Sequence, residues 1–167
     1  MSQNKIKQQV EDKILESYES MYRIAFTYVK NADDAMDVVQ DSAYKAIKYA
    51  ASVKKEQYIE TWIYKIVINC AIDFIKKNQK EILTDLPEEL ERPAAPENEQ
   101  DFDTIGALDI LNEKERAIII LRFFEEKKLE EIARILNINL STVKSMLYRS
   151  LKKLKVELKK EVFNYEG

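Results

Sequence analysis

The stretch from Leu129 to Leu158 constrains the fold most, because it holds two apolar helical patterns separated by a short break. Apolar residues recur on both sides of the break at steps of three and four, which is the spacing of one face of an α-helix. The break begins at Asn137, a residue type that tolerates the left-handed backbone of a tight turn. It ends at Ser141, which we expect to cap the second helix. This layout predicts a helix-turn-helix. The first stripe comprises Ile132, Ala133 and Leu136, and the second Val143, Leu147, Leu151, Leu154 and Leu158.

The opposite face of the second helix is polar and basic. Residues 141–160 hold seven Lys or Arg and a single acidic residue, Glu157. A basic helix face is often only solvated, but a helix-turn-helix delivers its second helix to the major groove of DNA, and a local positive excess suits a phosphate backbone. We therefore predict a DNA-binding face that comprises Thr142, Lys144, Ser145, Tyr148, Arg149, Lys152 and Lys153.

The composition favours helix throughout, with only two glycines and three prolines in 167 residues. Residues 1–80 contain three amphipathic stretches, which predict helices over about 6–30, 34–50 and 61–77 and a compact three-helix domain. Residues 105–167 form the second domain, where Asn112 and Glu115 have the spacing of a capping box. No alternating apolar run indicates a strand. The predicted fold is all-α, with two small helical domains.

An acidic segment separates the two domains. Residues 81–104 contain all three prolines and carry a net charge of −8, whereas residues 1–80 and 105–167 carry +2 and +3. This composition predicts a linker. The overall charge of −3 therefore conceals two mildly basic blocks.

The residue inventory excludes several function classes. The chain has no histidine and one cysteine, Cys70, so Ser-His and Cys-His catalysis, a disulfide within the chain, and most zinc or haem sites are excluded. We expect no catalytic residue, metal, cofactor or small-molecule substrate, and we expect Cys70 to lie in the core. No apolar run approaches the roughly 20 residues of a membrane span and no signal peptide opens the chain, so we expect a cytoplasmic protein.

Two further helix faces are candidate interfaces. Three carboxylates share one ridge of the second predicted helix, and taken alone they would be a solvated face. On the third helix, Asn69 could pair with a base edge and aromatic side chains could stack on an unpaired base. The alternatives are that Trp62 belongs to the core and that Asn69 and Asp73 bond each other. The first face comprises Asp34, Asp37, Gln40 and Asp41, and the second Trp62, Tyr64, Lys65, Asn69 and Lys76.

Three stretches together resemble the bacterial RNA polymerase sigma factors of the extracytoplasmic-function (ECF) type. Residues 34–46 (DAMDVVQDSAYKA) resemble the family's DAEDVVQETFLKA, and residues 61–69 (TWIYKIVIN) with Asp73 and Lys76 resemble TWLYRIAxNxxxDxxR. Residues 131–149 resemble EIAxxLGxxxGTVKSRLxRA. The departures are Met36 for Glu, Ile47 for Trp, Asn137 and Ser141 for Gly, and Met146 for an Arg, where a DNA backbone contact would weaken.

The resemblance implies a role for each face. The acidic face would dock on the clamp helices of the polymerase β′ subunit. The third-helix face, with the preceding loop Ser52 to Glu60, would capture a base of the −10 element. The helix-turn-helix would read the −35 element, with Lys144 or Arg149 on guanine and with Lys152 and Lys153 on phosphates. The implied partners are core RNA polymerase (β and β′ subunits), promoter DNA and a cognate, membrane-anchored anti-sigma factor.

Three alternatives remain at this level. A stand-alone helix-turn-helix regulator would bind its operator without polymerase, but it would not need the DVVQ and TWIYKI stretches. An enzyme would need a phosphate-binding loop, a metal cluster or a histidine-based site. A helical scaffold protein would not need the basic face.

Overall fold

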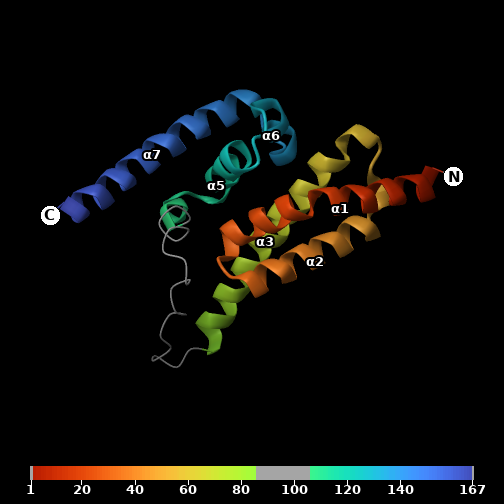
Figure 1. Cartoon of the computed structure of the whole chain (residues 1–167), viewed down its shortest axis with the longest axis horizontal. Helices are drawn as coiled ribbons and strands as arrows, with labels where there is room; N and C mark the ends of the chain where they lie inside the picture. The colour runs from red at the N-terminus through yellow and green to blue at the C-terminus, as the bar shows by residue number, and fades with distance from the viewer. Residues whose placement is uncertain (1, 86–105, 167) are drawn as a thin grey trace. The chain divides into compact units, whose positions relative to one another are not determined.

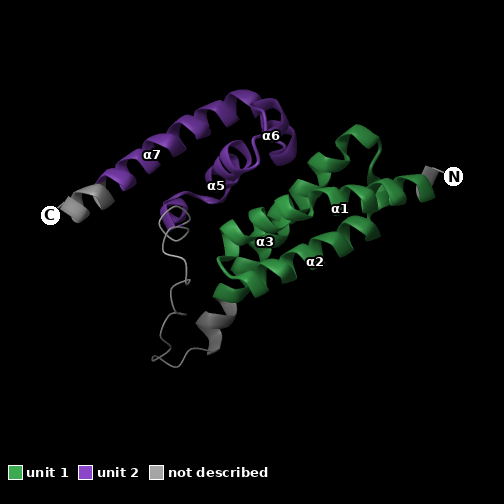
Figure 2. Ribbon diagram, in the orientation of Figure 1, with its two compact units in different colours: residues 1–95 green, residues 96–167 purple. Residues whose placement is uncertain are grey.

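The computed structural model describes residues 2–85 and 106–166. The chain forms two compact units, residues 1–95 and 96–167 (Figure 2). Every regular element within the described residues is helical (Figure 1), which confirms the all-α prediction.

Unit 1 is a bundle of three long helices, α1 (Ser2–Val29), α2 (Ala32–Lys48) and α3 (Ile59–Asp85), each of which packs against the other two. Two 3-10 turns, η1 (Ala50–Ser52) and η2 (Glu56–Tyr58), connect α2 to α3. Apolar side chains from all three helices fill the core, and Cys70 is among them as expected. The fully or nearly fully buried residues include Val10, Met21, Ile24, Val38, Ile63 and Val67.

The predicted break between the first two helices is confirmed. Lys30 adopts a left-handed backbone with φ of 60°. Asn31 then caps α2, because its Oδ1 accepts a hydrogen bond of 2.9 Å from the backbone N–H of Asp34. The cap satisfies one of the backbone donors that every helix start leaves unpaired.

The third helix is longer than the sequence pattern predicts. We expect its end near Lys77, whereas α3 continues to Asp85 and so into the stretch assigned to the linker. Half of residues 78–85 (NQKEILTD) are good helix formers and none is glycine or proline. The helix ends just before Leu86-Pro87, where proline disfavours continuation. The remainder of the predicted linker lies outside the described residues.

Unit 2 consists of short helices packed against one long helix. The short helices are η3 (Leu108–Ile110), α5 (Glu113–Ile119), the π-helical segment η4 (Ile120–Phe124) and α6 (Leu129–Leu136). The long helix is α7 (Leu140–Glu166). The predicted capping box is confirmed, since Asn112 and Glu115 bond each other's backbone N–H groups. The core of the unit comprises Leu108, Leu111, Ala117, Ile118, Ile120, Leu121, Ile132, Ile135 and Val143.

Helices α6 and α7 form the predicted helix-turn-helix. Asn137 ends α6 in the left-handed conformation, with φ of 55° and ψ of 49°. The prediction that Ser141 caps the next helix is wrong, because α7 already begins at Leu140 and the Val143 N–H bonds the carbonyl of Asn139 at 3.0 Å. Ser141 therefore lies in the first turn of α7. A second left-handed residue of unit 2, Glu126 with φ of 55°, precedes α6.

The buried face of α7 also differs from the predicted stripe. Val143 is fully buried as predicted, but Met146 and Ser150 are buried as well, whereas Leu151 and Leu158 of the predicted stripe are 41% and 49% exposed. The Ser150 hydroxyl donates to the Met146 carbonyl at 2.6 Å, so a polar side chain is satisfied in the core. Met146 is thus part of the core of unit 2. Its side chain does not lie at the surface, where the motif places an Arg that contacts the DNA backbone.

Candidate nucleic-acid and protein interfaces

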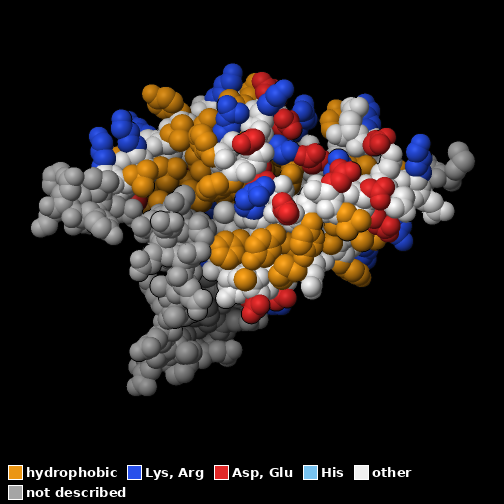
Figure 3. Space-filling model, in the orientation of Figure 1, with side chains coloured by type: hydrophobic (Ala, Val, Ile, Leu, Met, Phe, Trp, Pro, Cys, Tyr) orange, Lys and Arg blue, Asp and Glu red, His pale blue; other side chains and the backbone are white. Residues whose placement is uncertain are grey.

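The outward face of α7 carries six of the seven residues predicted for DNA binding. Thr142, Ser145, Arg149 and Lys152 follow one another at steps of three and four, so they share one ridge, and Lys144 and Tyr148 lie beside it. All six are exposed, Tyr148 to 75%. Figure 3 shows Lys and Arg side chains gathered along α7. Such a ridge can offer cations to phosphates and hydrogen-bond donors to base edges.

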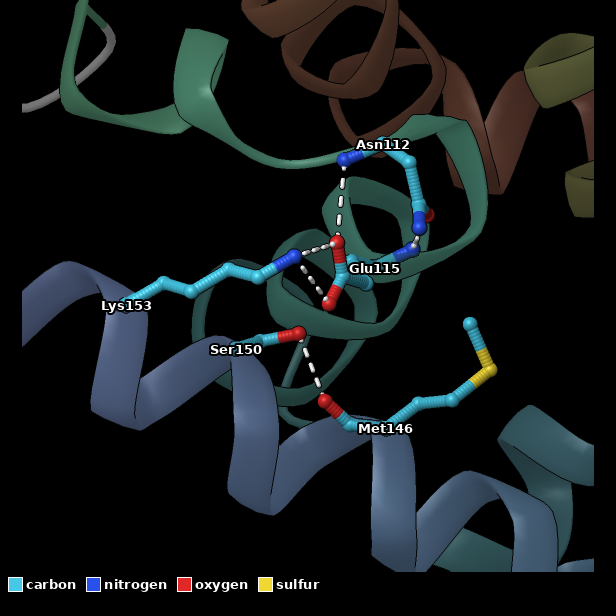
Figure 4. Close-up of polar contacts among 5 residues, drawn as sticks. All are labelled: Asn112, Glu115, Met146, Ser150 and Lys153. Carbon is cyan, nitrogen blue, oxygen red and sulfur yellow. Dashed lines mark hydrogen bonds and ion pairs between the residues drawn. The ribbon is translucent and has the colours of Figure 1, made fainter.

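Lys153 lies at the edge of this ridge, one turn from Arg149, but its ammonium is bonded within the protein. Its Nζ lies 2.8 Å and 3.0 Å from the two carboxylate oxygens of Glu115 on α5 (Figure 4). The Glu115 side chain is only 2% exposed, while that of Lys153 is 48% exposed. The prediction that Lys153 binds a phosphate is therefore not supported, since its ammonium already has an anionic partner within the protein.

The Glu115 carboxylate is held from two directions. Its Oε1 accepts the Asn112 backbone N–H at 3.1 Å in addition to the Lys153 bonds. Burial opposes ionisation of this carboxyl, but the hydrogen bonds from Lys153 and Asn112, with the charges of Lys153 and Arg149, outweigh it and lower the pKa of Glu115. Glu115 is thus a carboxylate at neutral pH and a fixed anion beneath α7.

The acidic ridge of α2 is present as predicted. Asp37, Gln40 and Asp41 are exposed and Asp34 is half-buried. Burial and the neighbouring charges of Asp37 and Asp33 raise the pKa of Asp34. The carboxylates therefore repel one another, and a basic partner would relieve that repulsion.

The same ridge continues into an aromatic and basic cluster that the sequence analysis did not identify. The Lys48 Nζ lies 5.9 Å from the ring centroid of Tyr44 and 5.4 Å from that of Tyr49, which are cation–π distances. The two rings are 63% and 54% exposed. Extending the helical spacing from Asp41 to residues 44 and 48 would have identified the ridge residues of this cluster.

On α3, four of the five predicted residues lie on one ridge. Trp62 is half-exposed, and Lys65, Asn69 and Lys76 are exposed, together with Asp73. Tyr64 is 4% exposed and belongs to the core. The prediction that Tyr64 contacts DNA is wrong, because a buried ring has no free face on which a base can stack.

The loop before α3 borders an acid-lined recess. Only one lysine, Lys13, offsets four carboxylates there, so the recess disfavours a phosphate backbone. The contact of this loop with the −10 element, which the resemblance implies, stays a prediction. Its lining comprises Gln9, Asp12, Lys13, Glu16, Glu56, Gln57, Ile59 and Glu60.

The described residues offer little for chemistry or membrane insertion. Among them, no three His, Cys, Asp or Glu side chains are grouped so that they could hold a metal ion. Over the same part of the chain, no helix is both long and apolar enough to cross a bilayer. Cys70 is a buried thiol.

Comparison with known proteins identifies the family. Residues 14–81 match sigma-70 region 2, and residues 104–154 match sigma-70 region 4. The RNA polymerase sigma factor SigV of Bacillus subtilis is 44% identical over 149 residues, which cover 89% of this chain and 90% of SigV. The chain belongs to the sigma-70 family. It is a sigma factor of the ECF type, and proteins of this family are not enzymes.

More distant relatives and solved structures agree with this sigma-factor assignment. The ECF RNA polymerase sigma factor SigW of Bacillus subtilis is 25% identical over 162 residues, covering 84% of each chain. The sigma factor RpoE of Bartonella quintana, solved with the anti-sigma factor NepR, has the same fold at a TM-score of 0.70, with 24% identity, and covers 89% of this chain and 96% of its own. CnrH, solved with the cytosolic domain of CnrY, also has a TM-score of 0.70 at 17% identity, covering 90% and 88%.

The two regional matches assign the described surfaces of this sigma factor. The region 2 match includes α2 with its acidic ridge and most of α3. The region 4 match includes the helix-turn-helix and the outward ridge of α7 up to Leu154. Family membership excludes the stand-alone regulator and scaffold alternatives, because both sigma regions are present in one chain.

Proposed function

We propose that this ECF sigma factor divides its work among three helix faces. The α2 ridge around Asp37 and Asp41 docks on the clamp helices of core RNA polymerase, the α3 ridge with Asn69 engages the −10 element, and the α7 ridge reads the −35 element. The exposed α7 ridge on the second helix of a helix-turn-helix carries the proposal, because that helix is the one such motifs place in the major groove.

The α2 ridge suits a protein partner better than a nucleic acid. Its exposed carboxylates would repel phosphates, whereas opposite charges across a protein interface raise association rates and specificity. Tyr44 and Lys48 extend the same ridge, so the docking surface includes an aromatic ring that can be buried against the partner.

The α3 ridge suits an opened DNA strand. Trp62 offers a half-exposed ring for base stacking, Lys65 and Lys76 offer charge, and Asn69 offers a paired donor and acceptor. Tyr64 is not part of this surface.

Transcription in vitro with purified core polymerase and a randomised promoter library tests this division. We expect specific initiation only when the protein is added, from promoters that share a −35 and a −10 element. Initiation without selection of either element would contradict it, and so would failure to bind core polymerase.

A cognate anti-sigma factor is part of the proposal. The RpoE structure contains NepR, and the CnrH structure contains the cytosolic domain of CnrY. The exposed Leu151 and Leu158, seven residues apart on one face of α7, offer this chain apolar side chains for such a partner. We place the protein in the cytoplasm, held by a membrane-anchored anti-sigma factor until a signal releases it. Co-purification of one membrane protein with the chain, lost in Leu151→Ser, tests this partner.

A further inference from the structure

Three residues of α7 form a seam against α5. Met146 is 8% exposed and Ser150 is fully buried, and Lys153 follows one turn later with its ammonium on Glu115 (Figure 4). These positions are separated by four and three residues, so they share one face of α7. The seam runs beside the outward ridge, since Lys153 lies one turn from Arg149, but its side chains are buried or bonded to α5.

Glu115 is well suited to anchor that seam. Its carboxylate bonds the N-terminal backbone of its own helix through the Asn112 N–H, and the Asn112 side chain accepts the Glu115 N–H at 2.9 Å. The carboxylate is therefore fixed relative to α5 before Lys153 contacts it. A buried carboxylate that loses its cation is strongly unfavourable. The Lys153 ammonium therefore remains bonded to Glu115 and does not move to a DNA phosphate.

We infer that Glu115 and Lys153 form a positioning pair that sets the rotation of α7, so that Lys153 acts on promoter recognition through the orientation of the α7 ridge and not as a phosphate ligand. This inference rests on the proposed −35 role of α7. Side chains project outward from a helix axis. A small rotation of α7 about its axis therefore displaces the side chains that must meet base edges. Loss of the pair would weaken sequence-specific recognition and leave non-specific phosphate attraction in place.

The inference predicts that Lys152 and Lys153 affect the salt dependence of DNA binding differently. Lys152 is exposed on the outward ridge, so Lys152→Gln should remove one phosphate contact and lower the salt slope of binding by about 0.9. Lys153→Gln should leave that slope unchanged. The probe is a random-sequence 30-base-pair duplex, titrated with the full chain at several salt concentrations. Lys152→Gln is the matched control, since it has the same charge change one residue away.

Glu115 supplies the second comparison. If Lys153 bound a phosphate, Glu115→Gln would remove a competing anion and strengthen DNA binding. If the pair positions α7, Glu115→Gln and Lys153→Gln should each reduce −35-dependent initiation by at least about threefold. Initiation by the double variant should then be no lower than that of the single variant with the lower activity. Lys153→Arg keeps a cation on Glu115 and should restore initiation.

The measurements separate this inference from the proposed function. Holoenzyme with the wild-type chain must first lose initiation when the −35 element is scrambled; if it does not, the −35 role fails. The coupling of residues 115 and 153 in thermal unfolding of the free chain does not depend on that role. A lower salt slope for Lys153→Gln, stronger DNA binding for Glu115→Gln, or additive effects of the two substitutions would each overturn the positioning pair.

Discussion

The Lys45 ammonium lies 3.4 Å from the Asp41 carboxylate, one helical turn away on α2, and 3.6 Å from the sulfur of Cys70. The acidic ridge thus has one partly neutralised carboxylate at Asp41, whereas Asp37 repels the carboxylate of Asp34 and has no cationic partner among the described residues. The two ends of the ridge should therefore respond differently to substitution.

Removing the Asp37 charge should slow docking on core polymerase more than removing the Asp41 charge. Asp37 contributes an exposed negative charge that attracts a basic partner, while Lys45 already screens Asp41. Asp37→Asn should lower the association rate severalfold at low salt, with a smaller difference at high salt. Interferometry with immobilised core polymerase measures this rate, and Glu19→Gln on α1 is a control outside the ridge. Equal effects of Asp37→Asn and Glu19→Gln would contradict the docking surface.

The raised pKa of Asp34 makes the folded state hold that proton more tightly than the unfolded chain does. The unfavourable contribution of ionised Asp34 is therefore present at neutral pH and disappears as the pH falls below the ordinary aspartate range. Asp34→Asn should keep or raise the melting temperature at pH 7. Carbon-13 titration of the side chain should give a pKa that falls part of the way in Asp37→Asn, because burial remains the larger cause. No change of that pKa would show that the two carboxylates do not interact.

The lowered pKa of Glu115 makes its contribution to stability depend on pH in the opposite direction to that of Asp34. Its folded-state pKa lies below the unfolded value, so its contribution to stability is complete above about pH 4.3, the ordinary glutamate value. That contribution is lost as the pH falls through the folded-state pKa. Thermal unfolding between pH 7 and pH 3 should show a decline that is shallower in Glu115→Gln, which is already destabilised at pH 7. The exposed residue Glu130 gives the matched control, Glu130→Gln.

Asn69 and Tyr64 should separate promoter recognition from stability. Asn69→Ala should change which −10 sequences are selected, while the free energy of unfolding changes by less than about 0.5 kcal/mol because the side chain is exposed. Tyr64→Ala should lower that free energy by about 3 kcal/mol, the range for a buried aromatic side chain, without altering −10 selection. Denaturant unfolding and promoter selection with holoenzyme provide the two measurements. Altered selection in Tyr64→Ala would contradict the assignment of Tyr64 to the core.

Lys144 and Lys152 should differ in the kind of binding that they support. Lys144→Ala should weaken binding to −35 DNA selectively, since this residue lies early on α7, where base edges are reached. Lys152→Ala should weaken binding to all duplexes and reduce the salt slope by about one unit. Titration of both variants against promoter and random DNA measures the difference. Equal losses on both DNAs for both variants would contradict it.

Local signals in the sequence predicted local structure well. Asn112 and Asn137 each mark a helix end as predicted, through a bond or backbone preference that involves a few neighbouring residues, whereas the cap expected at Ser141 is displaced. The partner of Lys153 could not be predicted in this way, because Glu115 is 38 positions away and only packing brings the two together. The apolar stripe of α7 was assigned to leucines, but α5 packs on a face that includes Ser150. Hydrophobicity alone does not reveal a small polar residue at a close contact.

Within residues 2–85 and 106–166, the residues with a left-handed backbone are Lys30, Glu126 and Asn137, so the chain turns these corners without glycine. Its two glycines lie elsewhere, at positions 106 and 167. A lysine or glutamate in this conformation carries roughly 1–2 kcal/mol of strain, but it also leaves the unfolded chain fewer conformations to lose than glycine would. The strain is the larger of the two effects, since the entropic gain is about 0.4–1 kcal/mol, so glycine at Lys30 or Glu126 would relieve more strain than it adds in unfolded-state entropy.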